Sequence, residues 1–325
     1  MTEAALGQVP AALADQWRGL LRRAALGHVF LSPTWLRAWW EEFGEGSPLL
    51  LTARRHERVV GIGAFMRQGD ALTFAGDPNV CDYMDFVLDA EASEEALASL
   101  WQALRGEEWR ELVLWGLPEG SPTLRLLPDL ARREGLTVER EREDVCPTLD
   151  LPATWEEYLE SLPGKDRHEL LRKLRRLHRL GEPTLEVLSS PAEATAAVDD
   201  FLHLHRISRP DKARFMDERM ARFFRRMVSY LAPEGWVRLY FLRLGEVRAA
   251  ALLCFVSGQA LQLYNSGYDP AYGHLAVGLL SKAMLVEHAI AQGYRKLDFL
   301  RGAEPYKYDL GARDEPVHRL RVLRG

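Results

Sequence analysis

The sequence predicts a two-domain protein of mixed α/β class, and three observations lead to that prediction. The chain has 325 residues, and single hydrophobic cores rarely grow beyond roughly 250–300 residues. Hydrophobic residues make up 47% and charged residues 27% of the chain, which is the composition of a globular protein rather than of a disordered one. In the first half, strands that follow the opening helical patterns form a meander and then alternate with helices, which is typical of a mixed sheet covered by helices, and the second half shows a similar strand–hairpin–helix plan.

The first half begins with helical patterns and continues as a meander of strands. Residues 8–26 can form an amphipathic helix, and Ser32 with Pro33 supplies an N-cap and a first-turn proline for the next helix. Trp39 and Trp40 follow at helical spacing and are expected in the core. The other elements expected here are strands at 49–54, 59–67, 71–75, 112–115 and 136–143, a polar loop at 76–86, and helices at 91–105 and 122–134.

A proline-punctuated segment at 144–152 is expected to cross from the first half into the second. We therefore expect an N-terminal domain at 1–146 and a C-terminal domain at 147–325. The second half is expected to contain helices at 153–161, 165–180, 191–207, 215–231 and 276–291, and strands at 184–188, 237–244, 247–255, 259–266, 296–300 and 316–323.

The helix expected at 165–180 is strongly basic and has two interpretations. Its cations can form a solvated face with helical ion pairs such as Glu169–Lys173. They can also bind phosphate, either at the nucleotide end of a cofactor or on an RNA backbone. The stretch lacks aromatic residues for base stacking.

Several classes of protein are not favoured by the sequence. The formal net charge is −5, so the chain is not a polycation suited to nucleic acid. The three cysteines lie far apart and no HExxH motif occurs, so we expect neither a disulfide framework nor a metal site. The sequence begins without a secretory signal and has no apolar run of the ~20 residues that a membrane span needs. We therefore expect a cytoplasmic protein.

The strongest local signal for chemistry lies in residues 259–308. A strand ends near Asn265, and a loop carrying Gly273 then leads to Gly278 at the start of a helix. Glycines at such a turn let backbone N–H groups approach an anion, and the helix start adds a partial positive charge. A pyrophosphate would suit this turn, although the glycines are equally suited to a tight chain reversal. The segment has neither a P-loop nor a G-x-G-x-x-G fingerprint.

These segments also carry a family resemblance. The strings YNSGYDPAYGHLAVGLL, EHAIAQG and DFLRGAEPYKY resemble the GNAT-like acetyltransferases of the CelD-like, BioF-like family. LSPTWLRAWWEEFG, VVGIGAFM and the loop at 82–85 look like the N-terminal half of that family, and RHELLRKLRRLHRLGE resembles its middle. A more distant similarity is to the Fem-type aminoacyltransferases. The resemblance implies tandem GNAT-like domains with the acyl-CoA N-acyltransferase fold.

The resemblance also implies a donor site for acetyl-CoA or another acyl-CoA as co-substrate. The strand at 261–266 would bind the pantetheine arm through its backbone, and the segment from 273 to 280 would hold the pyrophosphate. The sequence has only one well-placed glycine there, whereas the usual GNAT pattern is Q/R-x-x-G-x-G/A. The residues expected to bind this co-substrate are Leu263, Asn265, Ser266, Gly273, His274, Val277, Gly278 and Leu279.

Acyl transfer needs a base, oxyanion donors and an acid for the leaving thiolate. Asp298 and Glu304 flank a strand end and are candidate bases, although Asp298 can instead hold the following loop by hydrogen bonds. Lys307 can stabilise an oxyanion, and Tyr264 is a candidate acid. The residues expected to contact the acceptor are Asp82, Tyr83 and Asp85 from the N-terminal half, with Tyr268, Asp269, Arg301 and Tyr306 from the C-terminal half.

The function expected from sequence is transfer of an acyl group from acyl-CoA to an amine or hydroxyl of a small-molecule or saccharide-type acceptor. The acceptor would attack the thioester directly in a cleft between the halves. Two alternatives remain open: a Fem-like transferase that uses aminoacyl-tRNA, and a non-catalytic GNAT-fold scaffold in polysaccharide biosynthesis. Only the first alternative involves a nucleic acid, and the sequence does not indicate an oligomeric state.

Overall fold

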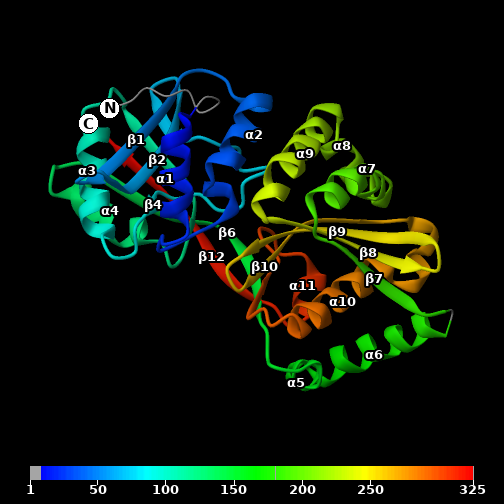
Figure 1. The fold of residues 1–325 in the computed structure, drawn as a ribbon. Coiled ribbons are helices and arrows are strands. Elements are labelled where there is room, and N and C mark those ends of the chain that lie inside the picture. Colours follow the sequence, from blue (N-terminus) through cyan, green and yellow to red (C-terminus); the bar gives the residue numbers. More distant parts are fainter. Residues whose placement is uncertain (1–8, 180, 325) are drawn as a thin grey trace. The chain divides into compact units, whose positions relative to one another are not determined.

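The computed structural model describes residues 9–179 and 181–324, and the chain divides into two units (Figure 1). One unit comprises the chain up to Val145 together with the segment from Glu315 onward, and the other is Cys146–Asp314. The last strand therefore returns to the first unit, whereas the division expected from sequence left residues 315–325 with the second half.

The first unit is built on a meander that leads into a parallel pair of strands. Strand β2 pairs antiparallel with β1 and β3, β3 pairs parallel with β5, and β5 pairs antiparallel with β12. The strands of this unit are β1 (Pro48–Arg55), β2 (Arg58–Gln68), β3 (Ala71–Phe74), β4 (Val87–Leu88), β5 (Glu111–Pro118), β6 (Thr137–Asp150, which continues into the second unit) and β12 (Arg313–Leu323, which begins in the second unit).

Within the described residues, four α-helices accompany these strands, and serine side chains cap the starts of α2 and α4. They are α1 (Ala11–Leu21), α2 (Pro33–Phe43), α3 (Ser93–Arg105) and α4 (Pro122–Arg132), with a 3-10 turn, η2, at Val29–Leu31. The Ser32 hydroxyl accepts a hydrogen bond from the Trp35 N–H, so the cap expected before α2 is confirmed. Trp39 is buried and Trp40 is half-buried, as expected for core-facing positions.

The second unit repeats this plan. Strand β9 pairs antiparallel with β8 and β10, β10 pairs parallel with β11, and β11 pairs antiparallel with the end of β6. Strand β7 pairs with β8 at the other side of the sheet. The strands are β7 (Pro183–Leu188), β8 (Val237–Leu244), β9 (Val247–Ser257), β10 (Ala260–Tyr268) and β11 (Lys296–Asp298). Each unit thus has an antiparallel meander whose third strand, β3 or β10, pairs with a parallel strand, β5 or β11, after a helix. The parallel strand then pairs with a strand that is shared with the other unit, β12 or β6.

Helices cover both faces of the strands of the second unit (Figure 1). Alternate strand residues such as Leu252, Cys254 and Leu263 share one core cluster with α5, α6 and α10, as the two-residue period of a strand requires. Helices α7 and α9 cover the other face. The helices are α5 (Trp155–Ser161), α6 (Gly164–His178), α7 (Pro191–Ser208), α8 (Pro210–Phe215), α9 (Glu218–Leu231), α10 (Val277–Ala291) and α11 (Pro305–Asp309), with 3-10 turns η3 (Ala232–Glu234) and η4 (Pro270–Leu275).

A few elements differ from the expectation. The helix expected at 215–231 starts later, at Glu218, because Asp217 caps it, and α8 precedes it as a separate turn. The strand expected at 296–300 ends at Asp298, and a short helix, α11, follows. The first helix is shorter than 8–26, and residue 8 and Leu180 lie outside the described residues.

The basic helix α6 carries the ion pairs expected of a solvated face. Glu169 contacts Arg172 at 2.7 Å and Lys173 at 3.4 Å. Leu170 and Leu177 are buried beneath it. Over residues 9–179 and 181–324, none of the helices has the length and apolarity needed to cross a bilayer.

Candidate functional site

Strands β10 and β11 separate after a short parallel ladder. The ladder joins Ala260–Gln262 to Lys296–Asp298, whereas β10 continues on to Tyr268. The register of β10 against β9 also shifts between Leu263 and Asn265, so a bulge falls at Tyr264. Such a bulge bends a strand and re-aims its side chains. The sheet is therefore open along this side of β10, next to the start of α10.

The chain after β11 folds around one buried ammonium group. Lys307, on α11, is 1% exposed. Its Nζ donates hydrogen bonds to the carbonyl oxygens of Leu300, Arg301 and Gly302 at 2.8–3.0 Å. The same Nζ lies 2.8 Å from Glu304 Oε2. An ammonium has three N–H donors, so the three carbonyls suffice to occupy Lys307. This geometry favours a loop-holding role over direct contact with a reacting oxyanion.

Asp298, at the end of β11, also holds the loop at residues 299–304. Its Oδ1 accepts a hydrogen bond from the Leu300 N–H at 2.8 Å, and its Oδ2 accepts one from Gln262 Nε2 at 3.4 Å. Leu300 has a φ of 56°, a conformation that costs a non-glycine residue free energy and must be held in place. Of the two carboxylates expected to act as bases, Asp298 is 5% exposed, whereas Glu304 is exposed.

The start of α10 is tightly packed. Gly278 lies under the ring of Tyr268, and a Cβ at this position would come within 3.0 Å of the ring. The preceding Ala276 has a φ of 57° and forms the N-cap of the helix. The first turn of α10 contains no acidic residue. A side chain at position 278 would therefore press on the Tyr268 ring, a packing constraint that is separate from the two interpretations of this turn given by the sequence.

A second buried lysine lies just inside α10. The Lys282 side chain is 6% exposed, its Nζ donates to the Gly278 carbonyl at 2.7 Å, and it lies 4.7 Å from the centre of the Tyr306 ring. Burial lowers the pKa of Lys282 to about 7, with nearby Lys212 adding to the effect. Burial also raises the pKa of Tyr306. An amine with a pKa near neutrality is uncommon outside functional sites.

Helices α7 and α8 bring further polar groups to the end of β10. His205 Nε2 lies 3.0 Å from Asn265 Oδ1, and Lys212 Nζ donates to the Ser266 carbonyl. Burial lowers the pKa of His205 to about 4 and that of Lys212 to about 8. Helix α7 packs closely against β10 at Gly267. A Cβ at this position would come within 2.4 Å of the His205 backbone, so only glycine allows the close approach. Two expected co-substrate contacts, Asn265 and Ser266, therefore also bind groups of the protein.

The remaining expected residues of this unit differ in their burial and in their contacts. Tyr264 packs on Phe224 and Phe255, with ring centres 5.6 and 4.9 Å apart. Asp269 caps η4 through the Ala271 N–H. The others are Leu263 and Val277, which are buried, Gly273 and His274, which are exposed on η4, and Leu279 and Arg301, which are half-buried.

The expected acceptor residues of the first unit occupy mostly buried positions. Tyr83 is 3% exposed and stacks on His28, with ring centres 4.5 Å apart, and Asp82 is half-buried. Asp85 is 4% exposed and accepts hydrogen bonds from the Phe86 N–H and the Thr123 hydroxyl. Burial raises the pKa of Asp85 to about 6, although hydrogen bonds from Ser121 and Thr123 oppose the shift.

Sequence reasoning missed Lys282 and Lys212 and interpreted His205 as structural. The three residues come from different helices, and only the folded chain brings Lys212 near enough to influence the pKa values of both His205 and Lys282. One signal was present: Lys282 lies within the mostly apolar first ten residues of α10, VGLLSKAMLV. Over the described ranges, no cluster of three or more metal-ligating side chains occurs.

A comparison with protein families identifies the segment that carries this geometry. Residues 164–308 match the family model described as an acetyltransferase (GNAT) domain. This segment is a GNAT-type domain. The match includes the diverging strands β10 and β11, the start of α10 and the loop held by Lys307. It therefore confirms the expected GNAT-like family. A comparison with curated proteins gives no match.

Solved structures share the fold along nearly the whole chain. FemX is similar with a TM-score of 0.68 and 11% identity, over 94% of this chain and 95% of its own. The C-terminal domain assigned to a lysylphosphatidylglycerol synthetase of Agrobacterium fabrum has a TM-score of 0.61 and 12% identity, over 97% and 92%. A conserved protein of unknown function from Bacteroides thetaiotaomicron has a TM-score of 0.61 and 11% identity, over 99% of each chain. The expected mixed α/β, GNAT-like fold class is confirmed.

Proposed function

We propose that the second unit transfers an acyl group from acyl-CoA to an amine or hydroxyl of a small acceptor. The observation that carries this proposal is the separation of β10 from β11 beside the acid-free start of α10, inside a GNAT-type domain. The open side of β10 offers backbone groups to a pantetheine arm, as a sheet edge does to a peptide. The start of α10 offers a partial positive charge to the pyrophosphate.

The two units differ at the equivalent helix, which supports the choice of the second unit as the donor site. Helix α3 lies between β3 and its parallel partner β5, as α10 lies between β10 and β11, and the first turn of α3 contains Glu94 and Glu95. Two carboxylates there repel a pyrophosphate, whereas α10 has none and has Lys282 one turn further on. We therefore propose that the first unit does not bind the donor.

In the proposed reaction, the acceptor N–H or O–H attacks the thioester carbon directly. Glu304, the exposed carboxylate at the end of the loop, takes the proton of the attacking group. The tetrahedral intermediate collapses as the C–S bond breaks, and the leaving thiolate takes up a proton. Asp298 and Lys307 act as positioning residues, because they fix the loop that presents Glu304.

Two finer expectations are part of the same proposal. The motifs quoted above favour the CelD-like, BioF-like group of acetyltransferases, and an acyl-CoA donor favours action in the cytoplasm. The exposed cations of α6 can bind phosphates, and they are the feature that favours the aminoacyl-tRNA alternative. A strongly salt-dependent complex with tRNA would support that alternative.

The test is a thermal-shift titration with acetyl-CoA, longer acyl-CoAs and free CoA. A ligand at about 100 times its dissociation constant should stabilise the protein by about 2.7 kcal/mol. The variant Leu279→Glu adds a negative charge in the first turn of α10 and should lose most of this shift. Leu279→Gln has nearly the same shape without the charge and serves as the matched control.

Equal shifts in both variants would place the pyrophosphate elsewhere. The absence of a shift with every CoA species, together with no acyl transfer, would leave the non-catalytic scaffold as the better proposal. Replacing Gly278 is a poorer test, because a Cβ there comes within 3.0 Å of the Tyr268 ring and the change in packing would itself alter the start of α10.

A further inference from the structure

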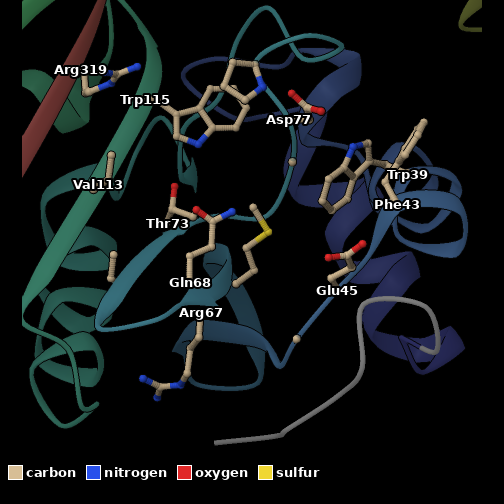
Figure 2. A pocket seen from close by; sticks show the side chains of 15 residues that line it. Trp39, Phe43, Glu45, Arg67, Gln68, Thr73, Asp77, Val113, Trp115 and Arg319 are labelled. Carbon is tan, nitrogen blue, oxygen red and sulfur yellow. The ribbon is translucent and has the colours of Figure 1, made fainter. Parts of the chain in front are cut away.

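The first unit contains a pocket that the donor-site proposal does not use. Its volume is about 570 Å³, within the roughly 300–1,000 Å³ of small-molecule sites. Helix α2, the ends of β2 and β3, the loop after β3, and strands β5 and β12 supply its lining (Figure 2). Every lining residue belongs to this unit. It includes none of the residues expected from sequence to contact the acceptor.

Aromatic and apolar side chains form much of the wall. Trp39 and Trp115 lie on opposite sides of the hollow in Figure 2, and Phe43 lies beside Trp39. The ring centres of Trp39 and Phe43 are 6.3 Å apart. Met66 and Val113 complete the apolar surface. Such walls bind the C–H faces of a ring-shaped molecule by dispersion and burial of apolar area.

The indole N–H of Trp39 lacks a hydrogen-bond acceptor within the part of the chain that the structure describes. The residue is 3% exposed, and its Nε1 has no hydrogen-bond partner among the described residues. Other tryptophans of this unit do have partners: Trp17 donates to the Leu31 carbonyl at 3.0 Å, and Trp109 donates to the Leu104 carbonyl at 2.7 Å. The Nε1 atom is itself covered in the structure, so a ligand reaches it only when the Trp39 ring shifts slightly. Because a buried indole N–H nearly always finds an acceptor, a ligand that brings one favours that shift.

The charges of the pocket disfavour an anionic ligand. Arg67 is paired with Glu107 at 2.6 Å, and Arg319 is paired with Glu143 at 2.7 Å, so carboxylates outside the lining neutralise both cations. Two carboxylates, Glu45 and Asp77, are themselves part of the lining. Gln68 and Thr73 add an amide and a hydroxyl. A ligand with hydroxyl or amine groups fits this rim, whereas a phosphate or carboxylate does not.

We propose that this pocket binds a saccharide ring that is neutral or carries an amine. A pyranose combines apolar C–H faces for the aromatic walls with hydroxyl groups around its edge. Those hydroxyls can accept from Trp39 Nε1 and donate to the carboxylates of Glu45 and Asp77. The site does not depend on the proposed acyl transfer, since all of its residues lie in the first unit.

The experiment titrates the full-length protein with glucosamine, N-acetylglucosamine and cellobiose, followed by saturation-transfer NMR and tryptophan fluorescence. Glucose 6-phosphate serves as the anionic probe and adenosine as the planar non-saccharide probe. We expect saturable binding of the neutral and amine-bearing sugars, and at least about tenfold weaker binding of glucose 6-phosphate. The absence of saturable binding for all three sugars, or tighter binding of adenosine, would overturn the proposed ligand class.

Three variants locate the site. Trp39→Phe keeps a ring but removes the N–H donor, and should weaken binding about three- to tenfold, the equivalent of one hydrogen bond. Trp115→Ala removes one wall and should weaken binding further. Trp40→Phe, on the same helix but outside the lining, is the matched control and should bind as the parent does. Circular dichroism and the acyl-CoA thermal shift report whether each variant is folded, independently of sugar binding. Unchanged affinity in both Trp39→Phe and Trp115→Ala would show that the sugar binds elsewhere.

Discussion

Replacing Lys282 with methionine should change how the stability of the protein depends on pH. The ammonium is buried in the second unit with one hydrogen bond to the Gly278 carbonyl and the ring of Tyr306 at 4.7 Å. Burial is the largest cause that lowers its pKa from 10.5 to about 7; Lys212 and Lys307 lower it further, whereas Glu304 raises it. Methionine keeps the length and apolar stem of the side chain and removes the charge.

The sign of the effect follows from proton binding in the two states. Below pH 7 the folded and unfolded chains both carry the proton, so this group adds no slope to the stability curve. Between the folded pKa of about 7 and the unfolded value of 10.5, the unfolded chain binds more protons, and the free energy of unfolding rises with pH. The difference of about 3.5 pKa units corresponds to an upper limit of about 5 kcal/mol.

The assay is urea denaturation of the parent and the variant at pH 6.5 and pH 9.5. The parent should gain about 3 kcal/mol from Lys282 between these two values, and Lys282→Met should lack that gain. At pH 6.5 the variant should be more stable than the parent by up to about 4 kcal/mol, since about 1 kcal/mol is lost with the hydrogen bond. Lys165→Met, at an exposed position of α6, is the matched control and should follow the parent. If Lys282→Met showed the same rise with pH as the parent, the lysine would not be held as a neutral amine.

Three further substitutions test other parts of the structure. Burial raises the pKa of Asp85 from 3.8 to about 6, so the parent should lose up to about 3 kcal/mol as pH rises through this window. Asp85→Asn should remove that loss, and urea curves at pH 4 and pH 8 that shift equally in both proteins would contradict it. Ala276→Gly relieves a φ of 57° and should add about 0.5–1 kcal/mol, seen as a higher melting temperature; an unchanged one would mean that this turn is unstrained. Lys307→Met leaves three carbonyls without their donor. The free energy of unfolding should fall by about 3 kcal/mol or more, and acyl transfer should be lost. A variant of parental stability would show that other groups hold the loop.

Local sequence was sufficient to predict most elements, because their signals lie within a few residues. Ser32 and Pro33 define the start of α2, and Thr154 and Ser190 each form a capping box at the start of α5 and α7. Gly258, with a φ of 58°, joins β9 to β10 as expected for a hairpin turn. The GNAT-like fold class could also be predicted, because the motifs between residues 259 and 308 are contiguous.

Only the tertiary structure decided which distant segments meet. The return of β12 to pair with β5 joins residues about 200 positions apart, and strand pairing at that separation leaves no local trace. The sequence places Lys212 and Lys282 on two different helices, but their low pKa values arise from burial in the folded unit. Trp39 shows a helical core pattern in the sequence, and only the fold reveals that its N–H lacks a partner beside a pocket. Propensity and capping act over a few residues, whereas burial, and with it the chemistry of a side chain, depends on everything that packs around it.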